Sequence, residues 1–90
     1  MDQIFSRNKD LPWQAFDDET IIINPESKDS FELNEVGSFI WSRIDGVKSV
    51  AKIRDEICAH YDARPEMVDE DLTDLLYEMA KKNLIGEVTS

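Results

Sequence analysis

Between residues 30 and 46 the hydrophobic pattern changes from the alternation of a strand to the spacing of a helix. Phe31 and Leu33 alternate with the polar residues Ser30 and Glu32. This alternation predicts a short strand with one apolar face. From residue 34 onward the apolar residues recur three and four positions apart, which is typical of a helix. The rest of the chain is organised around this change of period.

The predicted helix is apolar around more than half of its circumference. Asn34 is a suitable N-cap, and Glu35 suits the positive first turn. The apolar residues that follow are Val36, Phe39, Ile40, Trp41 and Ile44. Asp45-Gly46 is expected to end the helix, with the glycine in the left-handed C′ conformation. A helix this apolar is usually central to a hydrophobic core.

Two more strands are expected before this stretch, so that the first part of the chain forms an antiparallel meander. Trp13–Asp17 is a candidate first strand, and the β-branched run Thr20–Asn24 is a candidate central strand. Ser30–Leu33 is then the third strand, and it is expected at an edge because no later segment is an obvious partner. Residues 1–10 are polar and unpatterned, and we expect them to be flexible.

Two helices and a short strand are expected after the central helix. Ser49 is a plausible N-cap for the second helix. The apolar face of that helix consists of Val50, Ile53, Ile57 and Tyr61. Pro65 suits the first position of the third helix. The apolar residues of the third helix are Val68, Leu72, Leu75, Leu76 and Met79.

The end of the third helix carries several helix-stop signals. The positive charges of Lys81 and Lys82 favour the negative end of the helix. Asn83 is expected at the C′ position, and Leu84 can fold back onto Met79 as in a Schellman cap. Residues 85–88 are a candidate last strand. The predicted fold class is therefore α+β, with a three-stranded antiparallel sheet followed by a three-helix, winged helix-turn-helix bundle.

Length and charge limit the function. Ninety residues make a single domain, which we place at residues 11–88. Ten basic and twenty acidic side chains give a formal net charge of −10, so a cationic peptide is a better partner than nucleic acid or an anionic membrane. No apolar run approaches the roughly 20 residues that span a bilayer. We expect a small cytoplasmic monomer.

Catalytic chemistry is nearly absent from the sequence. Cys58 and His60 are two positions apart, which places them about 200° apart on a helix, so they cannot form a thiolate–imidazole pair there. One cysteine and one histidine do not make a zinc site, and the three glycines are too scattered for a phosphate-binding loop. We expect no catalytic residue, no metal and no cofactor, and therefore no enzyme.

Two other functions are each compatible with part of the pattern. A winged helix-turn-helix suggests DNA binding, but the segment Glu66–Glu78 carries six acids and no base, whereas a DNA-reading helix needs arginine or lysine. An acyl carrier protein is also small and acidic, and Asp29-Ser30-Phe31 resembles the tripeptide whose serine takes phosphopantetheine. That serine should open a helix, whereas Ser30 opens a strand pattern.

The pattern as a whole resembles the PqqD-like family, the recognition elements for precursors of ribosomally synthesised, modified peptides. The resemblance covers roughly Trp13 to Gly86. The residues that carry it are Leu33, Asn34, Gly37, Ile40, Trp41, Ile44, Asp45, Gly46, Val50, Ile53, Tyr61, Val68, Asp71, Leu72, Leu75, Leu76, Met79, Leu84 and Ile85. Two departures are Met79, where leucine is usual, and Asn83, where glycine is usual. Both are physically conservative.

The resemblance implies a peptide-binding adaptor. Family members bind the leader segment of a precursor peptide between the third strand and the third helix. They present it to a modifying enzyme such as a radical SAM protein, a cyclodehydratase or a leader peptidase. An edge strand also offers unpaired backbone groups for strand addition. Carried onto this chain, the expected peptide-binding residues are Ser30, Phe31, Glu32, Leu33, Asp71, Asp74, Leu75, Glu78, Met79 and Lys82.

Overall fold

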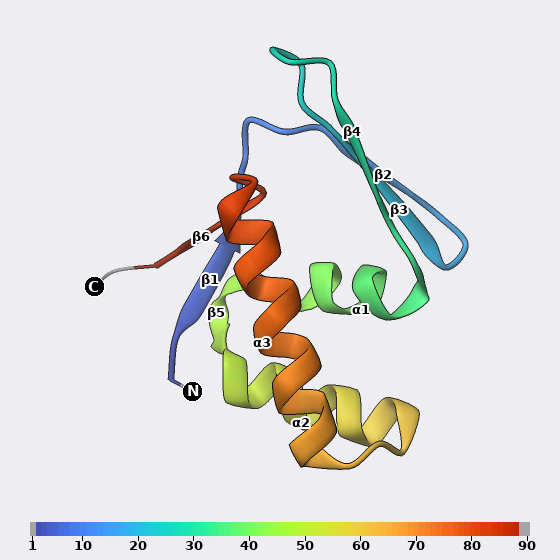
Figure 1. The fold of residues 1–90 in the computed structure, drawn as a ribbon, viewed down its shortest axis with the longest axis vertical. Coiled ribbons are helices and arrows are strands. Elements are labelled where there is room, and N and C mark those ends of the chain that lie inside the picture. The colour runs from blue at the N-terminus through green and yellow to red at the C-terminus, as the bar shows by residue number, and fades with distance from the viewer. Residues whose placement is uncertain (1, 89–90) are drawn as a thin grey trace.

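The protein has an α+β fold with three helices and two antiparallel sheets (Figure 1). The computed structural model describes residues 2–88. In chain order the elements are β1 (Ile4–Arg7), β2 (Trp13–Phe16), β3 (Glu19–Ile23), β4 (Ser30–Leu33), α1 (Glu35–Arg43), β5 (Asp45–Ser49), α2 (Val50–Tyr61), α3 (Pro65–Lys81) and β6 (Ile85–Glu87). None of the helices in this part of the chain is long and apolar enough to cross a membrane.

The first sheet is the predicted meander, in the order β2-β3-β4. Phe31 of β4 lies opposite Ile22 of β3, and Trp13 of β2 lies opposite Ile22 on the other side. Ile22 has no exposed surface, as expected for the centre of a sheet packed on a helix. The predicted edge position of β4 is confirmed, because its second side has no strand partner among residues 2–88.

The second sheet, in the order β5-β1-β6, was not predicted. Residues 1–10 were expected to be unpatterned and flexible, whereas Ile4–Arg7 forms the central strand β1. Likewise, β5 lies in a region where only helices were expected. Four half-buried residues give β1 too short a pattern to be recognised, and its partners lie about 40 and 80 residues further along the chain. Such pairing is stabilised by long-range contacts that local patterns do not contain.

The turn into α1 and the end of this helix depend on specific residues. The side chain of Asn34 accepts a hydrogen bond from the Gly37 N–H at 2.9 Å, which confirms the predicted N-cap. A Cβ atom at position 37 would lie only 3.2 Å from the Leu33 Cβ. Glycine, which has no Cβ, therefore lets β4 and α1 approach each other closely there. The helix ends at Arg43, whereas the predicted apolar face extended one residue further, to Ile44. Gly46 has the expected positive φ of 82°, but within β5.

The caps of α2 and α3 follow the prediction. The hydroxyl of Ser49 accepts from the Lys52 N–H at 3.2 Å, and Pro65 is the first residue of α3. At the other end of α3, Asn83 has a φ of 61°. The Leu84 N–H donates to the Met79 carbonyl at 2.9 Å, and the Asn83 N–H donates to the Ala80 carbonyl at 3.1 Å. These two bonds are a Schellman motif, with asparagine in place of glycine.

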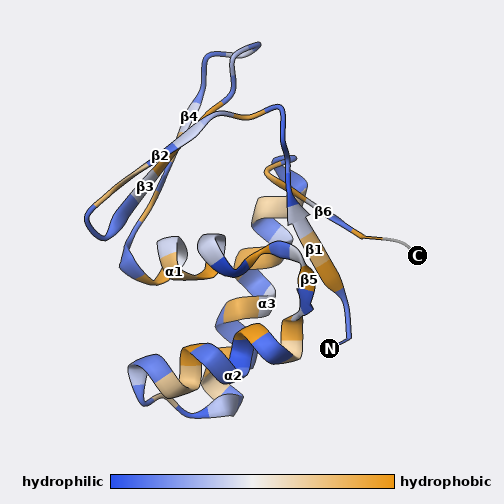
Figure 2. Ribbon diagram, turned by 180° about the vertical axis from the view of Figure 1, so that it is seen from behind, coloured by the Kyte–Doolittle hydropathy of each residue, from blue (hydrophilic) through white to orange (hydrophobic). Residues whose placement is uncertain are grey.

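The core lies where α1 meets the β2-β3-β4 sheet, α2 and α3. Trp41, Ile44 and Ile53 are at most 1 % exposed. Figure 2 shows hydrophobic and hydrophilic positions alternating along α2 and α3, as expected for helices with one buried face. The predicted apolar faces of these helices are buried, except that Leu75 and Tyr61 keep intermediate exposure. In α1, Val36 is 42 % exposed although it belongs to the predicted apolar face.

Candidate functional site: a cleft beside the free strand edge

A cavity of about 440 Å³ lies between β4 and the C-terminal half of α3. We call it the β4–α3 cleft. Its lining residues are Ser30, Phe31, Glu32, Leu33, Leu75, Glu78, Met79, Lys82 and Leu84. Phe31, Leu33 and Leu75 are half-buried, whereas Met79 is 2 % exposed. The cleft therefore offers apolar side chains that are accessible from outside.

Most of the predicted site residues come together in this cleft. Eight of the ten line it: all four from β4, and Leu75, Glu78, Met79 and Lys82 from α3. Asp71 lines an adjoining cavity instead, and Asp74 is exposed and lines neither. Leu84 was not predicted as a site residue, although its expected fold-back onto Met79 already placed it beside one.

The hydrogen bonds of β3 show which backbone groups of β4 are free. The Ile23 N–H donates to the Pro12 carbonyl at 2.9 Å, toward β2, whereas the Asn24 N–H donates to the Asp29 carbonyl at 2.9 Å, toward β4. Successive residues of a strand direct their N–H and C=O groups to opposite sides. The β3 residues two and four positions before Asn24 therefore face β4.

These two β3 residues lie opposite Phe31 and Leu33. The N–H and C=O groups of Phe31 and Leu33 are consequently used within the sheet. The corresponding groups of Ser30 and Glu32 point to the open edge of β4. Both of these residues are exposed. The open edge has the hydrogen-bonding pattern of a strand that can accept one more strand.

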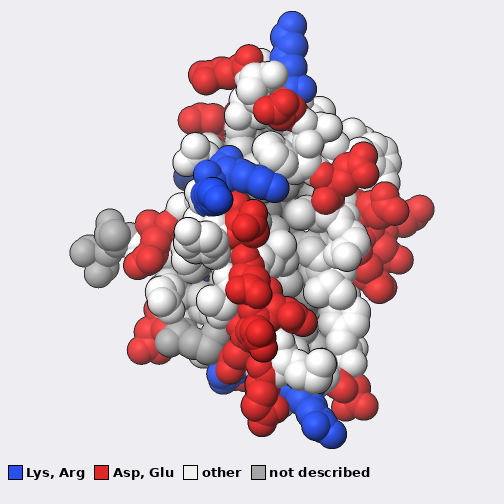
Figure 3. All heavy atoms as spheres, in the orientation of Figure 1, with Lys and Arg blue, Asp and Glu red and all other residues white. Residues whose placement is uncertain are grey.

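The charge around the cleft is strongly uneven. Figure 3 shows acidic side chains in a continuous column over α3, with basic groups near both ends and a broad uncharged surface alongside. The acids of this helix are Glu66, Asp69, Glu70, Asp71, Asp74 and Glu78. At the C-terminal end of α3, the Lys82 Nζ lies 5.5 Å from the Phe31 ring centroid, so a cation–π contact connects the two walls of the cleft.

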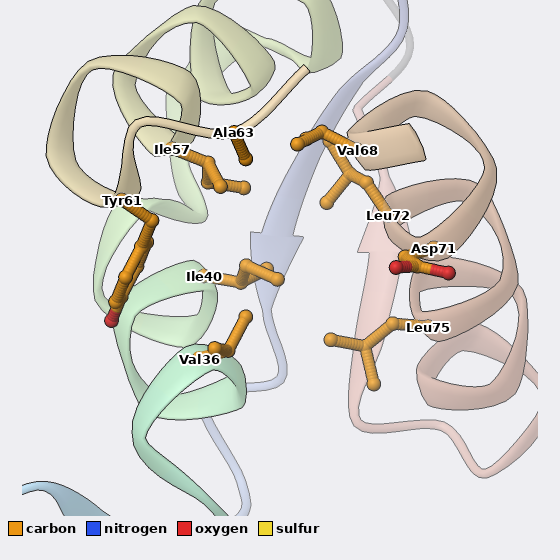
Figure 4. A pocket seen from close by; sticks show the side chains of 9 residues that line it. All are labelled: Val36, Ile40, Ile57, Tyr61, Ala63, Val68, Asp71, Leu72 and Leu75. Carbon is orange, nitrogen blue, oxygen red and sulfur yellow. The ribbon is translucent and has the colours of Figure 1, made fainter. Parts of the chain in front are cut away.

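A second, more apolar cavity of about 220 Å³ adjoins the cleft, and Leu75 lines both. In Figure 4, side chains from α1 and α2 face side chains from α3 across this cavity. Val36 is its most exposed apolar residue. The lining residues are Val36, Ile40, Ile57, Tyr61, Ala63, Val68, Asp71, Leu72 and Leu75. Nine largely apolar residues make this cavity suitable for an aliphatic or aromatic side chain.

Neither the cleft nor the rest of the described chain contains a recognisable catalytic arrangement. No group of three or more His, Cys, Asp or Glu residues within residues 2–88 could hold a metal ion. His60 is exposed and stacks on Phe39 with ring centroids 4.7 Å apart, while Cys58 packs against the core. The contacts of both side chains are those of packing residues. The free strand edge and the apolar cleft therefore point to binding.

Comparison with known proteins gives consistent matches. Residues 19–85 match the family model described as Coenzyme PQQ synthesis protein D (PqqD). A protein of Xanthomonas oryzae pv. oryzae (strain PXO99A), named PqqA binding protein, is 29% identical over 75 residues, which cover 83% of this chain and 79% of that protein. A protein of the same name from Xanthomonas euvesicatoria pv. vesicatoria (strain 85-10) is 28% identical over 68 residues, which cover 76% and 72%.

A solved structure is also similar in fold. It is described as TbiB1 in complex with the TbiA(beta) leader peptide, and it superposes with a TM-score of 0.84 at 30% sequence identity. The superposition covers 94% of this chain and 99% of that one. The family model covers more than half of the chain, and both sequence and fold agree with it. The chain therefore belongs to the PqqD family.

Proposed function

We propose that this protein is a non-enzymatic adaptor that binds the leader segment of a ribosomally made precursor peptide and presents it to a modifying enzyme. The observation that carries the proposal is the open edge of β4 beside an apolar cleft. Relatives are named for binding PqqA, and a similar solved structure contains a leader peptide. Binding, and not chemistry on the peptide, is the role that this geometry supports best.

In the proposed complex, the leader adds a strand to the open edge of β4. The N–H and C=O groups of Ser30 and Glu32 bond to its backbone, which supplies affinity without sequence preference. Selectivity comes from the side chains that enter the β4–α3 cleft. An apolar side chain further along the leader reaches the adjoining cavity past Leu75. Asp71, Asp74 and Glu78 favour a leader with lysine or arginine beside its apolar anchors.

The partner that receives the leader is proposed at the level of its class. It is an enzyme that modifies or cleaves precursor peptides, such as a radical SAM protein, a cyclodehydratase or a leader peptidase. Ser30 and Glu32 of β4 are exposed. The leader side chains that point to the same side of the sheet as these two residues, away from the cleft, therefore stay accessible to the enzyme. An adaptor of this kind contributes position and local concentration, whereas the enzyme contributes the chemistry.

Two alternatives have less support. Ser30 is the first residue of β4 and does not open a helix, which argues against a phosphopantetheine attachment site. The winged helix-turn-helix description remains an interpretation of the helices, and the acids along α3 would repel the phosphates of DNA. Incubation with a phosphopantetheinyl transferase and coenzyme A should leave the mass unchanged. Titration with random duplex DNA at low salt should show no saturable binding.

The direct test is capture of the leader from the native host. The wild-type protein and the Glu32→Pro variant are immobilised, and the bound short peptides are identified by mass spectrometry. We expect at least one peptide to be retained by the wild type and largely lost from the variant, since proline removes an outward N–H from β4. Glu32→Ala, which keeps the N–H, is the matched control. Equal retention by wild type and Glu32→Pro would mean that the peptide does not pair with this edge.

A further inference from the structure

A further cavity of functional interest lies beside the opposite edge of the same sheet. It has a volume of about 300 Å³ and lies between the β2–β3 hairpin, α1 and the end of α2. We call it the acidic–aromatic cavity. The residues that matter for its chemistry are Trp13, Asp17, Asp18, Glu35, Trp41 and Tyr61. It lies beside β2, the other edge of the β2-β3-β4 sheet, and shares no residue with the β4–α3 cleft.

Three carboxylates around this cavity lack a cationic partner. Asp17, Asp18 and Glu35 form no ion pair with any residue of the described chain. Burial raises the pKa of Tyr61, and the negative charges of Glu35 and Asp18 raise it further. Asp17, Asp18, Glu35 and Tyr61 all line the same cavity. Unpaired carboxylates that converge on one cavity favour the entry of a cation.

Aromatic rings form the remaining walls. Trp13 is 43 % exposed and meets Trp41 edge-to-face, with ring centroids 6.0 Å apart. Arg7 already lies over the Trp13 ring, with its guanidinium carbon 5.2 Å from the centroid, which shows that this ring accepts a stacked guanidinium. Arginine combines a planar cation that stacks on indole with a fork of donors for carboxylates. The walls of this cavity match both properties.

A buried polar group adds an independent indication. Trp41 has no exposed surface, and its indole Nε1–H has no acceptor among the described residues. Buried donors in native structures are nearly always bonded, so an orphaned one needs an explanation. Trp41 lines the acidic–aromatic cavity. Because Trp41 has no exposed surface, an entering polypeptide segment can supply a carbonyl acceptor for the indole only if the wall of the cavity moves, whereas its cation can reach the exposed carboxylates directly.

The geometry points to the acidic–aromatic cavity as the docking site for an arginine side chain on a loop of the enzyme that receives the leader. This inference rests on the proposed function. The leader itself is held at β4, with β3 in between, so the two edges of the sheet are about 10 Å apart. The adaptor thus holds the leader at one edge and the enzyme at the other, and both can be bound simultaneously.

The two tryptophans provide a direct readout, because the sequence contains only two and both line this cavity. Their indole N–H signals are followed by ¹H–¹⁵N NMR while the peptide acetyl-Gly-Arg-Gly-amide is added. We expect saturable shifts of both signals. The citrulline peptide, which has the same shape without the charge, should give little change. Loss of two screened ion pairs in the Asp18→Asn/Glu35→Gln variant should weaken arginine-peptide binding about fivefold. The Glu26→Gln/Asp29→Asn variant, altered in the β3–β4 turn, should bind like the wild type.

Equal shifts with the citrulline peptide, or equal affinity in the Asp18→Asn/Glu35→Gln variant, would overturn the assignment. Displacement of the arginine peptide by the captured leader would overturn the choice of an enzyme loop, because the cavity would then belong to the leader. In capture experiments with leader-loaded protein, a peptide-modifying enzyme that mass spectrometry identifies with the wild type and the control variant but not with Asp18→Asn/Glu35→Gln supports the docking site. Leader binding by that variant should be unchanged, so failure of this inference leaves the proposed function standing.

Discussion

The two sheets of this small protein have the same number of strands but are built from different kinds of contact. The β2-β3-β4 sheet is a meander of consecutive strands joined by short turns. The β5-β1-β6 sheet joins the beginning, the middle and the end of the chain, with Phe5 opposite Glu87 and Ile4 opposite Ser49. The first sheet has an open edge beside a cleft, whereas the second joins the start of α2, through β5, and the end of α3, through β6, to one framework.

The difference suggests a division of roles, in which the β2-β3-β4 sheet offers the binding edge and the β5-β1-β6 sheet stabilises the position of α3. Helix α3 lies between the two sheets and contacts both with neighbouring residues. Leu75 lines the cleft beside β4, while Leu76 lines a cavity with Phe5 of β1 and is 4 % exposed. Because β6 follows α3 and Leu76 packs beside Phe5 of β1, we expect the β5-β1-β6 sheet to hold α3 in place, so that the cleft is formed before the peptide binds. Such preorganisation lowers the ordering cost of binding.

The largest expected effect comes from removing the central strand of the second sheet. Deletion of residues 2–7 leaves β5 and β6 without their common partner. We expect a loss of more than about 3 kcal/mol of unfolding free energy, and a fall in melting temperature of at least about 12 °C for a domain of this size. Thermal denaturation followed by circular dichroism measures it, with Lys9→Ser as a control at an exposed site. An unchanged melting temperature would show that this strand is dispensable.

The next effect separates neighbouring leucines on α3. Leu76→Ala should cost about 2–5 kcal/mol of stability, because it empties a buried site. Leu75→Ala should cost less stability, because Leu75 is half-buried, but it should weaken leader binding about tenfold. Chemical denaturation and isothermal titration with the captured leader measure the two quantities. If both variants changed stability and affinity in the same proportion, the division of α3 into two faces would be wrong.

Proline substitutions test which residues of β4 direct their N–H groups toward β3 and which direct them toward the open edge. Phe31→Pro and Leu33→Pro should damage the ladder with β3 and lower the melting temperature. Ser30→Pro and Glu32→Pro should keep the fold and lose about 1 kcal/mol of binding free energy for each missing hydrogen bond. Alanine at the same four positions controls for the loss of side chains. Leader affinity at the wild-type level in both Ser30→Pro and Glu32→Pro would exclude strand addition at this edge.

The acids of α3 should affect the rate of association more than the lifetime of the complex. Asp74→Ser with Glu78→Ser should slow association with a basic leader several-fold and reduce its dependence on salt. Surface plasmon resonance at two ionic strengths separates the two rate constants. Glu66→Ser with Glu70→Ser, further toward the beginning of α3, is the matched control. A change in dissociation alone would place Asp74 and Glu78 inside the buried contact.

The smallest expected effect concerns Tyr61. Its pKa is raised first by burial and then by Glu35 and Asp18, so Asp18→Asn/Glu35→Gln should lower it only part of the way toward 10.0. Absorbance at 295 nm in a Tyr77→Phe background follows this single tyrosine. Since the folded-state pKa is raised, the contribution of Tyr61 to stability is complete below pH 10 and is lost as the pH rises through the folded-state pKa. An unchanged Tyr61 pKa in the variant would show that Asp18 and Glu35 do not interact with the Tyr61 hydroxyl.

The sequence alone determined those features that depend on neighbouring residues. The strand-to-helix change at Asn34, the N-cap at Ser49, the start of α3 at Pro65 and the Schellman motif at Asn83 all follow from local hydrogen bonding and backbone preference. Eight of the ten predicted peptide-binding residues also came together in one cleft. The α3 residues of this set recur three and four positions apart and therefore share one helix face, whereas the juxtaposition of that face with β4 was implied by the family resemblance.

Only the tertiary structure decided which segments pair across the chain and which surfaces remain open. Ile4–Arg7 is a strand because β5 and β6 provide partners on both sides, and no local pattern signals this. The cavity beside Trp13 and Trp41 gathers residues from three separate segments, residues 13–20, 35–42 and 60–61. Which N–H and C=O groups of β4 remain free depends on which of its residues bond to β3. In each case the deciding contacts join distant residues, whose mutual positions are fixed by packing of the whole domain.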